Sequence, residues 1–240
     1  MAKSKVLGYA WNGKSVLDGS PIVVVFNGLS NVSKNSKTGA MVQAWILRQD
    51  CDPITAQQTG RDASVCGDCK RRPILARENG EEECYVTVFR APLAIWRAWK
   101  KGRYAPLPTD HDSLKSIFVG KVVRFGAYGD PAAVPTGLWA SIIATGLGGH
   151  TGYTHQWRRP SAQPLKRFLM ASVDSNAEAV EAQSSSWRTF RVASAGDFAR
   201  MRNEISCPAS QESAHRLTCI ACKACAGDLF GKASVVIQAH

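Results

Sequence analysis

The sequence predicts an α/β fold, either a partial (β/α) barrel or an open parallel sheet, that carries metal-binding cysteine loops. Beyond residue 110, β-branched apolar runs alternate with helix-like segments, as they do in β-α-β units. Seven of the eight cysteines fall into two tight groups with Cys-x2-Cys spacing, which lets both thiolates reach one ion. Polar residues follow successive predicted strands, at the edge where parallel sheets bind their ligands.

The first 110 residues contain a few separate elements. The run PIVVVF at residues 21–26 is continuous and β-branched, which is typical of a strand buried on both faces. Pro92 falls in the first turn of a second apolar segment, where proline favours a helix start. We expect strands at 21–26 and 85–89, helices at 40–47 and 92–101, and turn-rich loops at 31–39 and 50–83. Trp96 and Trp99 should pack against the core.

Beyond residue 110 the pattern becomes regular. We expect helices at 113–118, 135–145 and 176–183, and strands at 121–125, 152–154, 167–173, 187–192 and 233–237. We treat residues 1–110 as an N-terminal segment that carries the first cysteine loop and packs on the barrel. Residues 111–240 form the β/α repeat region with the C-terminal cysteine loop, and the two parts together make one compact domain.

The composition bounds the class of protein. Of the 240 residues, 45% are hydrophobic and 20% are charged, so the chain can bury a full core and is not disordered. No apolar run reaches the ~20 residues that a membrane helix needs. The first residues have no apolar signal core, so we expect a cytoplasmic protein with reduced thiols, in the host cytoplasm if a phage encodes it. A secreted, disulfide-bonded protein is the alternative.

The formal net charge is +11, and the basic residues occur in short clumps. Such an excess attracts polyanions, and nucleic acid is the commonest polyanion in a cytosol. A solvated basic surface without a partner is the alternative. The clumps are Lys70-Arg71-Arg72, the set Arg97, Lys100, Lys101 and Arg103, then Arg158-Arg159, Lys166-Arg167, and the pair Arg188 and Arg191.

The first cysteine group is Cys66, Cys69 and Cys84. Three thiolates would leave one metal position open for a substrate or cofactor, as a catalytic metal requires. Alternatively, Cys51 or a histidine completes a structural zinc site.

The second cysteine group has four members and is complete by itself. Four thiolates satisfy either a closed zinc site or a four-iron cluster, and the Cys-x2-Cys-x2-Cys run slightly favours the cluster. A further alternative is that the two groups converge in space and leave one thiol unliganded. The four residues are Cys207, Cys219, Cys222 and Cys225.

Three successive predicted strands end in polar residues. These ends read Gly126-Ala-Tyr-Gly129-Asp130, Tyr153-Thr-His155-Gln and Ser-Val-Asp174-Ser. We predict a ligand site at this edge, with Asp130, Tyr153, His155 and Asp174 as candidate catalytic residues and Gly126 and Gly129 as cofactor-binding candidates. Asp130 and Asp174 could instead cap the helices that follow them.

Several familiar motifs are missing from the sequence. It contains no GxGxxG after a strand, no GxSxG and no zinc-deaminase signature. His150 and His155 flank Tyr153, but their spacing does not fit a relaxase-type nuclease. Trp139 and Trp157 are most simply core or groove wall, although Trp157 with Arg158 and Arg159 could also stack and pair on a nucleic acid.

The order of these motifs resembles a group of uncharacterised phage and prophage proteins related to radical S-adenosylmethionine barrels. The similarity covers residues 60–240 and rests on short elements: Cys-x2-Cys with Cys84-Tyr, the strand ending in Gly-Asp130, Tyr153-Thr-His, and Ser-Val-Asp174-Ser. It implies a partial barrel, a phage origin, an iron–sulfur cluster on the first cysteine group, and S-adenosylmethionine as a possible cofactor. Two features depart from these relatives: Cys84 lies too far from Cys69 for the usual CxxxCxxC loop, and His155 stands where they tend to have lysine.

Two hypotheses follow. The first is a phage-type iron–sulfur protein that binds or modifies nucleic acid, with its cluster at the carboxyl edge of a parallel sheet. The second is a non-catalytic, zinc-stabilised factor that binds nucleic acid or a host protein.

Overall fold

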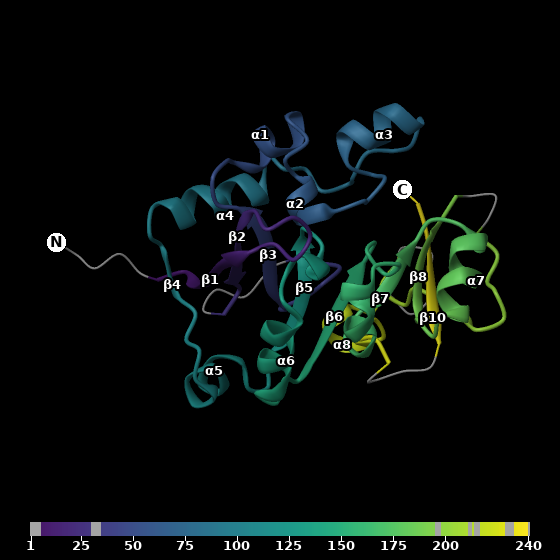
Figure 1. The fold of residues 1–240 in the computed structure, drawn as a ribbon. Helices are drawn as coiled ribbons and strands as arrows, with labels where there is room; N and C mark the ends of the chain where they lie inside the picture. The colour runs from purple at the N-terminus through teal and green to yellow at the C-terminus, as the bar shows by residue number, and fades with distance from the viewer. Residues whose placement is uncertain are drawn as a thin grey trace.

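The computed structural model describes residues 6–29, 35–194, 198–210, 213, 217–228 and 233–239. The described residues form a mixed α/β fold around one ten-stranded sheet, in the order β4-β1-β2-β3-β5-β6-β7-β8-β10-β9 (Figure 1). The α/β class is therefore confirmed. The two end strands do not pair with each other within the described part of the chain.

The strands are β1 (Gly8–Lys14), β2 (Pro21–Asn27), β3 (Val42–Arg48), β4 (Tyr104–Pro106), β5 (Val122–Tyr128), β6 (Gly149–Thr154), β7 (Met170–Val173), β8 (Thr189–Ala193), β9 (Glu204–Ser206) and β10 (Ser234–Gln238). The α-helices are α1 (Pro53–Gln58), α2 (Ala63–Cys66), α3 (Pro73–Asn79), α4 (Ala91–Lys100), α5 (His111–Phe118), α6 (Thr136–Ala144), α7 (Asn176–Ser184) and α8 (Cys219–Cys222). Two 3-10 helices, η1 (Pro131–Ala133) and η2 (Pro160–Arg167), follow β5 and β6.

The sheet is parallel over most of its width. Strands β3, β5, β6, β7, β8, β10 and β9 pair in parallel, as the alternating pattern of the second half predicts. The N-terminal strands depart from it, because β1 and β2, and then β2 and β3, pair antiparallel. Strand β3 lies before residue 110 and β5 lies after it, and the two strands pair directly. The sheet therefore includes strands from both of the parts that the sequence suggests.

Three expectations for the first 110 residues are wrong. The segment expected as a turn-rich loop at 50–83 contains the short helices α1, α2 and α3. The segment expected as a helix at 40–47 is strand β3, buried along almost its whole length between β2 and β5. Pairing on both sides overrides the weak helix preference of Gln, Ala and Leu there. The segment expected as a strand at 85–89 forms bends and turns that lead into α4, with Tyr85 and Phe89 exposed at 78% and 62%.

A strand boundary also differs from the prediction. The strand expected over 167–173 begins only at Met170, because η2 occupies the preceding residues up to Arg167. The sequence analysis also did not predict β1, whose inward face carries only Gly8 and Ala10 among its buried residues.

The core lies under the centre of the sheet and is rich in aromatic rings. Phe26 meets Phe118 edge-on at 5.3 Å between ring centroids, and Phe125 lies 4.6 Å from Trp139. Trp139 is fully buried, and its indole N–H donates to the Pro131 carbonyl at 2.9 Å. This cluster fixes β2 and β5 against α5 and α6, and thereby fixes the carboxyl end of β5.

Helices α1–α6 form two groups (Figure 1). Figure 1 shows α1–α4 together on the upper side, beside β3, and α5 and α6 together on the lower side. The segment with α2 and α3 therefore lies over the carboxyl end of β5, where ligands of parallel sheets bind. None of the described helices is long and apolar enough to cross a membrane.

Candidate functional site

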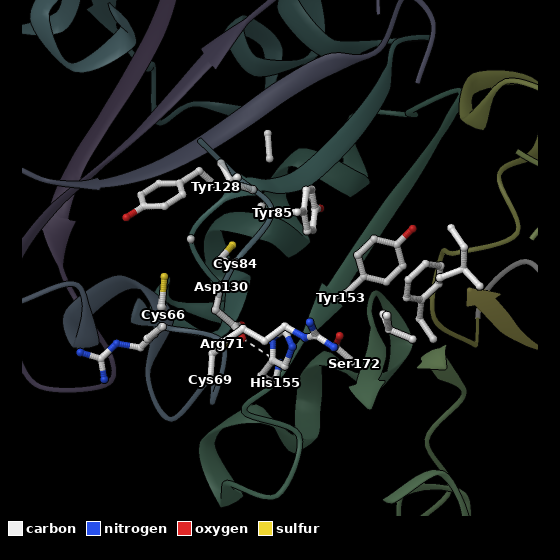
Figure 2. Close-up of a pocket in the computed structure, with 18 of the residues that line it drawn as sticks. Cys66, Cys69, Arg71, Cys84, Tyr85, Tyr128, Asp130, Tyr153, His155 and Ser172 are labelled. Atoms are coloured by element: carbon white, nitrogen blue, oxygen red, sulfur yellow. Dashed lines mark hydrogen bonds between the residues drawn. The ribbon is translucent and has the colours of Figure 1, made fainter. Parts of the chain in front are cut away.

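A cavity of about 460 Å³ lies at the carboxyl edge of the parallel strands (Figure 2). Its wall comes from the ends of β5, β6, β7, β8 and β10 and from residues 66–86, which carry the first cysteine group and are called the cysteine segment. This volume lies within the range of ordinary small-molecule sites. The structure thus brings the predicted strand ends together. The residues that line the cavity include Cys66, Cys69, Cys84, Tyr85, Arg124, Tyr128, Asp130, Tyr153, His155, Ser172, Asp174 and Phe190.

Gln156, which follows β6, forms hydrogen bonds to the turn between Cys66 and Cys69. The Gln156 amide donates to the Cys66 carbonyl at 3.1 Å and accepts from the Asp68 N–H at 3.2 Å. Gly67 makes this contact possible, because its φ is +57° and a Cβ there would lie 2.3 Å from the Gln156 side chain. The first cysteine group is therefore tied directly to the carboxyl end of a central strand.

All three thiols of the first group line the cavity. Burial raises the pKa of Cys69 to about 12 and the pKa of Cys66 well above its usual range, and the charges of neighbouring thiolates raise both further. Backbone N–H groups two residues ahead oppose this effect: Arg71 donates to Cys69, and Val86 donates to Cys84. Such donors stabilise a thiolate, which is the form that binds metal.

Two buried donors near these thiols have no hydrogen-bond partner among the residues that the structure describes. The hydroxyl of Tyr128, a residue that is 4% exposed, and the Nε of Arg72, which is 9% exposed, are both unsatisfied. The nearby charges that act on Tyr128 include Cys66 and Cys84, and those that act on Arg72 include Cys66 and Cys69. Because an unpaired buried donor costs free energy, these groups fit a site where a bound group supplies the acceptor.

The two carboxylates at the strand ends, Asp130 and Asp174, have different structural roles. Asp130 caps η1 by accepting from the Ala132 N–H at 2.9 Å, and it also accepts from the His155 N–H at 2.8 Å. Burial raises the pKa of Asp130, while the charge of His155 and these hydrogen bonds lower it. The capping alternative is thus right for Asp130, although this residue also lines the cavity.

Asp174 does not cap the following helix, because Ser175 takes that position and accepts from the Glu178 N–H. Asp174 instead accepts from Arg71 at 3.0 Å and lies 3.8 Å from Lys70. This pairing ties the cysteine segment to the end of β7 across the cavity. The capping alternative is therefore wrong for Asp174.

The glycines predicted to bind a cofactor have a backbone role in this structure. Gly126 and Gly129 have φ values of +76° and +79°. A Cβ on Gly126 would lie 2.7 Å from the Gly129 carbonyl, and a Cβ on Gly129 would lie 2.7 Å from Ile46. Both also line the cavity, so their predicted role in cofactor binding stays a prediction.

The second cysteine group surrounds a smaller cavity of about 40 Å³, which all four thiols line. It is held by backbone contacts to three distant segments: the Cys207 N–H donates to Val236, the Cys219 N–H donates to Lys37, and the Cys225 carbonyl accepts from Gly152. Cys207 also accepts from the backbone N–H of Ala209. The two cysteine groups thus surround different cavities.

The two cavities share a wall that includes Tyr153, Phe190 and Cys219. The Tyr153 ring packs against Phe190 at 4.3 Å, and its hydroxyl donates to the thiol of Cys225. Burial raises the pKa of Tyr153 well above its usual range, and the neighbouring thiolates raise it further. Tyr153 therefore connects the predicted ligand site with the second cysteine group.

All eight cysteines are free thiols. Within the described residues, no three His, Cys, Asp or Glu side chains are close enough to hold one ion as they stand. The donor chemistry of each group fits a metal, but the thiols of each would have to turn toward a common point. Cys51 lines neither cavity and lies beside Asp50, Arg48 and Arg61, whereas His155 shares the main cavity with the first group.

Many residues of the basic clumps already form ion pairs or hydrogen bonds within the protein. Arg72 pairs with Asp62 at 2.7 Å, and Arg159 pairs with Asp68 at 2.6 Å. Trp157 is buried at 2% exposure, so it offers no free face to a nucleic-acid base. Intramolecular partners are also present for Lys70, Arg71, Arg158, Arg188 and Arg191.

The fold and the site together define a mixed α/β protein with a cysteine-lined cavity at the carboxyl edge of its sheet. No family model, no curated protein and no solved structure matches this chain.

Proposed function

We propose that this chain is an iron–sulfur protein whose working site is the main cavity, with Cys66, Cys69 and Cys84 holding a four-iron cluster. The observation that carries the proposal is the surroundings of these thiols at the carboxyl edge. Two of them accept backbone N–H groups, and the unsatisfied Tyr128 hydroxyl and Arg72 Nε lie near them. Hydrogen bonds to cluster sulfurs are one of the means by which proteins tune such centres.

A cluster with three thiolate ligands supplies one iron with an open position for a substrate or cofactor, and the sequence resemblance suggests S-adenosylmethionine. The chain's own residues would shape that site. Arg71 and Asp174 hold the cysteine segment over the cavity, and Asp130 fixes the backbone of His155 at its edge. In this reading the curved, mostly parallel sheet corresponds to the partial barrel, and the second cysteine group holds a separate metal that pins the C-terminal segment.

A zinc-stabilised binding factor is the second candidate. One observation favours it: His155 lines the same cavity as the three thiols, and three cysteines with one histidine make a closed zinc site. The four thiols around the small cavity would hold a second zinc ion.

Metal analysis of the native protein tests the proposal. We expect anaerobically purified protein to be brown and to contain iron and sulfide, and Cys69→Ser to lose the iron of the first group. Cys51→Ser is the matched control, because Cys51 is also a buried free thiol but lines neither cavity. Colourless protein with two zinc ions per chain and no sulfide would overturn the iron–sulfur proposal and support the zinc candidate.

We also propose nucleic acid as the partner. The internal ion pairs do not change the net charge of +11, and α4 presents basic side chains without acidic partners among the described residues. Arg97 and Lys101 are exposed, and no carboxylate lies within 4 Å of either among the described residues. Replacing both with Gln should reduce the slope of log affinity against log salt by about 2, the number of phosphate contacts removed. Lys121→Gln, an exposed lysine elsewhere, is the control. Equal slopes would contradict a contact through α4.

A further inference from the structure

The charges around the main cavity are balanced on one side only. The carboxylates near the first cysteine group already have partners: Asp62 pairs with Arg72, and Asp174 and Glu82 pair with Arg71. Along β5 the cavity wall instead carries a cation with no carboxylate partner in the described part of the chain. That cation is Arg124.

Arg124 lies in the middle of β5 and is partly buried, with its side chain in the cavity wall. Its guanidinium donates one hydrogen bond, to the Tyr85 hydroxyl at 3.1 Å. Among the described residues, no carboxylate lies within 4 Å of it. A guanidinium removed from water without an anion costs free energy, so this arrangement favours an anionic ligand.

Two tyrosines lie near this cation. Tyr85 and Tyr153 are both close enough to influence Arg124 electrostatically, and Phe190 packs on Tyr153 at 4.3 Å. Figure 2 shows Tyr85 and Tyr153 on the same part of the cavity wall, with Ser172 below Tyr153. Aromatic side chains bind planar rings by stacking, and the guanidinium fork fits the oxygens of a phosphate.

We propose that Arg124 binds the phosphate group of a nucleotide in the main cavity, with the base against the tyrosine-lined wall. This inference deepens the proposed function, because it rests on the cavity being the working site and on nucleic acid being the partner. It names the substrate class as a nucleotide, either free or as one unit of a strand.

Arg124 could instead serve as a counter-charge for the second cysteine group, because it also lies near Cys219. The structure favours the ligand role. Arg124 lines the main cavity and not the smaller cavity that the second group surrounds, whereas Lys37 lines both cavities and acts on both Cys207 and Cys219. The two roles predict different outcomes for the same variant.

Calorimetric titration distinguishes the ligand-binding role of Arg124 from the counter-charge role. The probes are AMP and CMP, the nucleosides adenosine and cytidine, and inorganic phosphate, each added to the full-length protein. We expect at least one monophosphate to bind wild type about tenfold or more tightly than its nucleoside, since a hydrogen bond to a charged group contributes about that much. Arg124→Gln should remove this difference and leave nucleoside binding unchanged. Lys121→Gln is the control and should behave as wild type, because Lys121 is exposed and does not line the cavity.

Arg124→Lys keeps the charge without the planar fork and should fall between wild type and Arg124→Gln; it decides the question if the Gln variant does not fold. Three results would overturn the proposal: no binding of any monophosphate to wild type at millimolar concentration, equal affinities of wild type and Arg124→Gln, or loss of metal from the second cysteine group in Arg124→Gln with unchanged nucleotide affinity. The iron and sulfide content of wild type is measured separately, so failure of the cluster proposal is distinguishable from failure of this one.

Discussion

A fully buried ion pair connects β8 to β9, just before the second cysteine group. Arg191 Nε and Glu204 Oε1 are 2.9 Å apart, Nη2 and Oε2 are 2.6 Å apart, and both side chains are 0% exposed. Arg191 also donates to the Ala199 carbonyl, and Glu204 accepts from the Met201 N–H. The pair thus holds the segment that leads into Cys207.

Glu204→Gln removes one charge and leaves the Arg191 guanidinium buried without its counter-ion. Breaking a buried pair in this way costs about 3–5 kcal/mol of unfolding free energy. At about 2–4 °C per kcal/mol for a chain of this size, the Tm should fall by roughly 6–20 °C. Urea denaturation and thermal melting followed by circular dichroism measure both quantities.

The double variant Arg191→Met with Glu204→Leu provides the internal comparison. Replacing a buried pair with apolar side chains is often neutral or stabilising, so the double variant should recover most of the stability lost in Glu204→Gln. Arg158→Gln is the control, because its pair with Glu181 is about half exposed and is screened by solvent, so its loss should change stability little. A loss below about 1 kcal/mol in Glu204→Gln, or a double variant as unstable as the single one, would refute this reasoning.

Three further predictions concern the centre of the fold. Burial lowers the pKa of His150 from 6.5 to about 4, so the unfolded chain takes up this proton at a higher pH than the folded chain does. The free energy of unfolding should therefore fall by about 3 kcal/mol as pH drops from 6.5 to 4, and urea titrations of His150→Gln should lack this part of the slope. Tyr128→Phe should leave the metal-free protein equally stable or about 1 kcal/mol more stable, because the substitution removes an unpaired buried hydroxyl. The reconstituted cluster of this variant should show a lower reduction potential by voltammetry. An unchanged potential would place the hydroxyl outside the site. Gly129→Ala should lower stability by about 1–3 kcal/mol in thermal melts, since φ is +79° and the new Cβ would lie 2.7 Å from Ile46; a neutral substitution would exclude the backbone role.

The regular second half of the chain was predictable because its elements follow local rules. Strands β5 and β10 and helices α5, α6 and α7 match the expected segments within a few residues. Asp110 and Ser175 cap α5 and α7 by accepting a backbone N–H, as these residue types do at helix starts. Hydrophobic period and capping are properties of neighbouring residues, so one sequence suffices to recognise them.

The errors fall where distant segments decide the outcome. Residues 42–48 form a strand because β2 and β5 lie on either side of them, and no local pattern contains that information. Residues 85–89 have a strand-like composition, but they run as turns beside the cavity, with Tyr85 in its wall. Arg124 and Tyr128 could not be predicted as site residues from the sequence. Only the structure shows that, among the described residues, Arg124 has no carboxylate partner and the buried Tyr128 hydroxyl has no hydrogen-bond partner.

The amino-acid sequence by itself determined the α/β class, the two cysteine groups and the polar ends of three successive strands. Those features depend on residue type and spacing, which are legible along the chain. Only the tertiary structure decided that the strand ends and the first cysteine group share one cavity, that the second group lies behind Tyr153, and that many basic clumps pair internally. Contacts such as Arg71 with Asp174 join residues about a hundred positions apart, and the pairing of such residues is set by how the whole sheet packs.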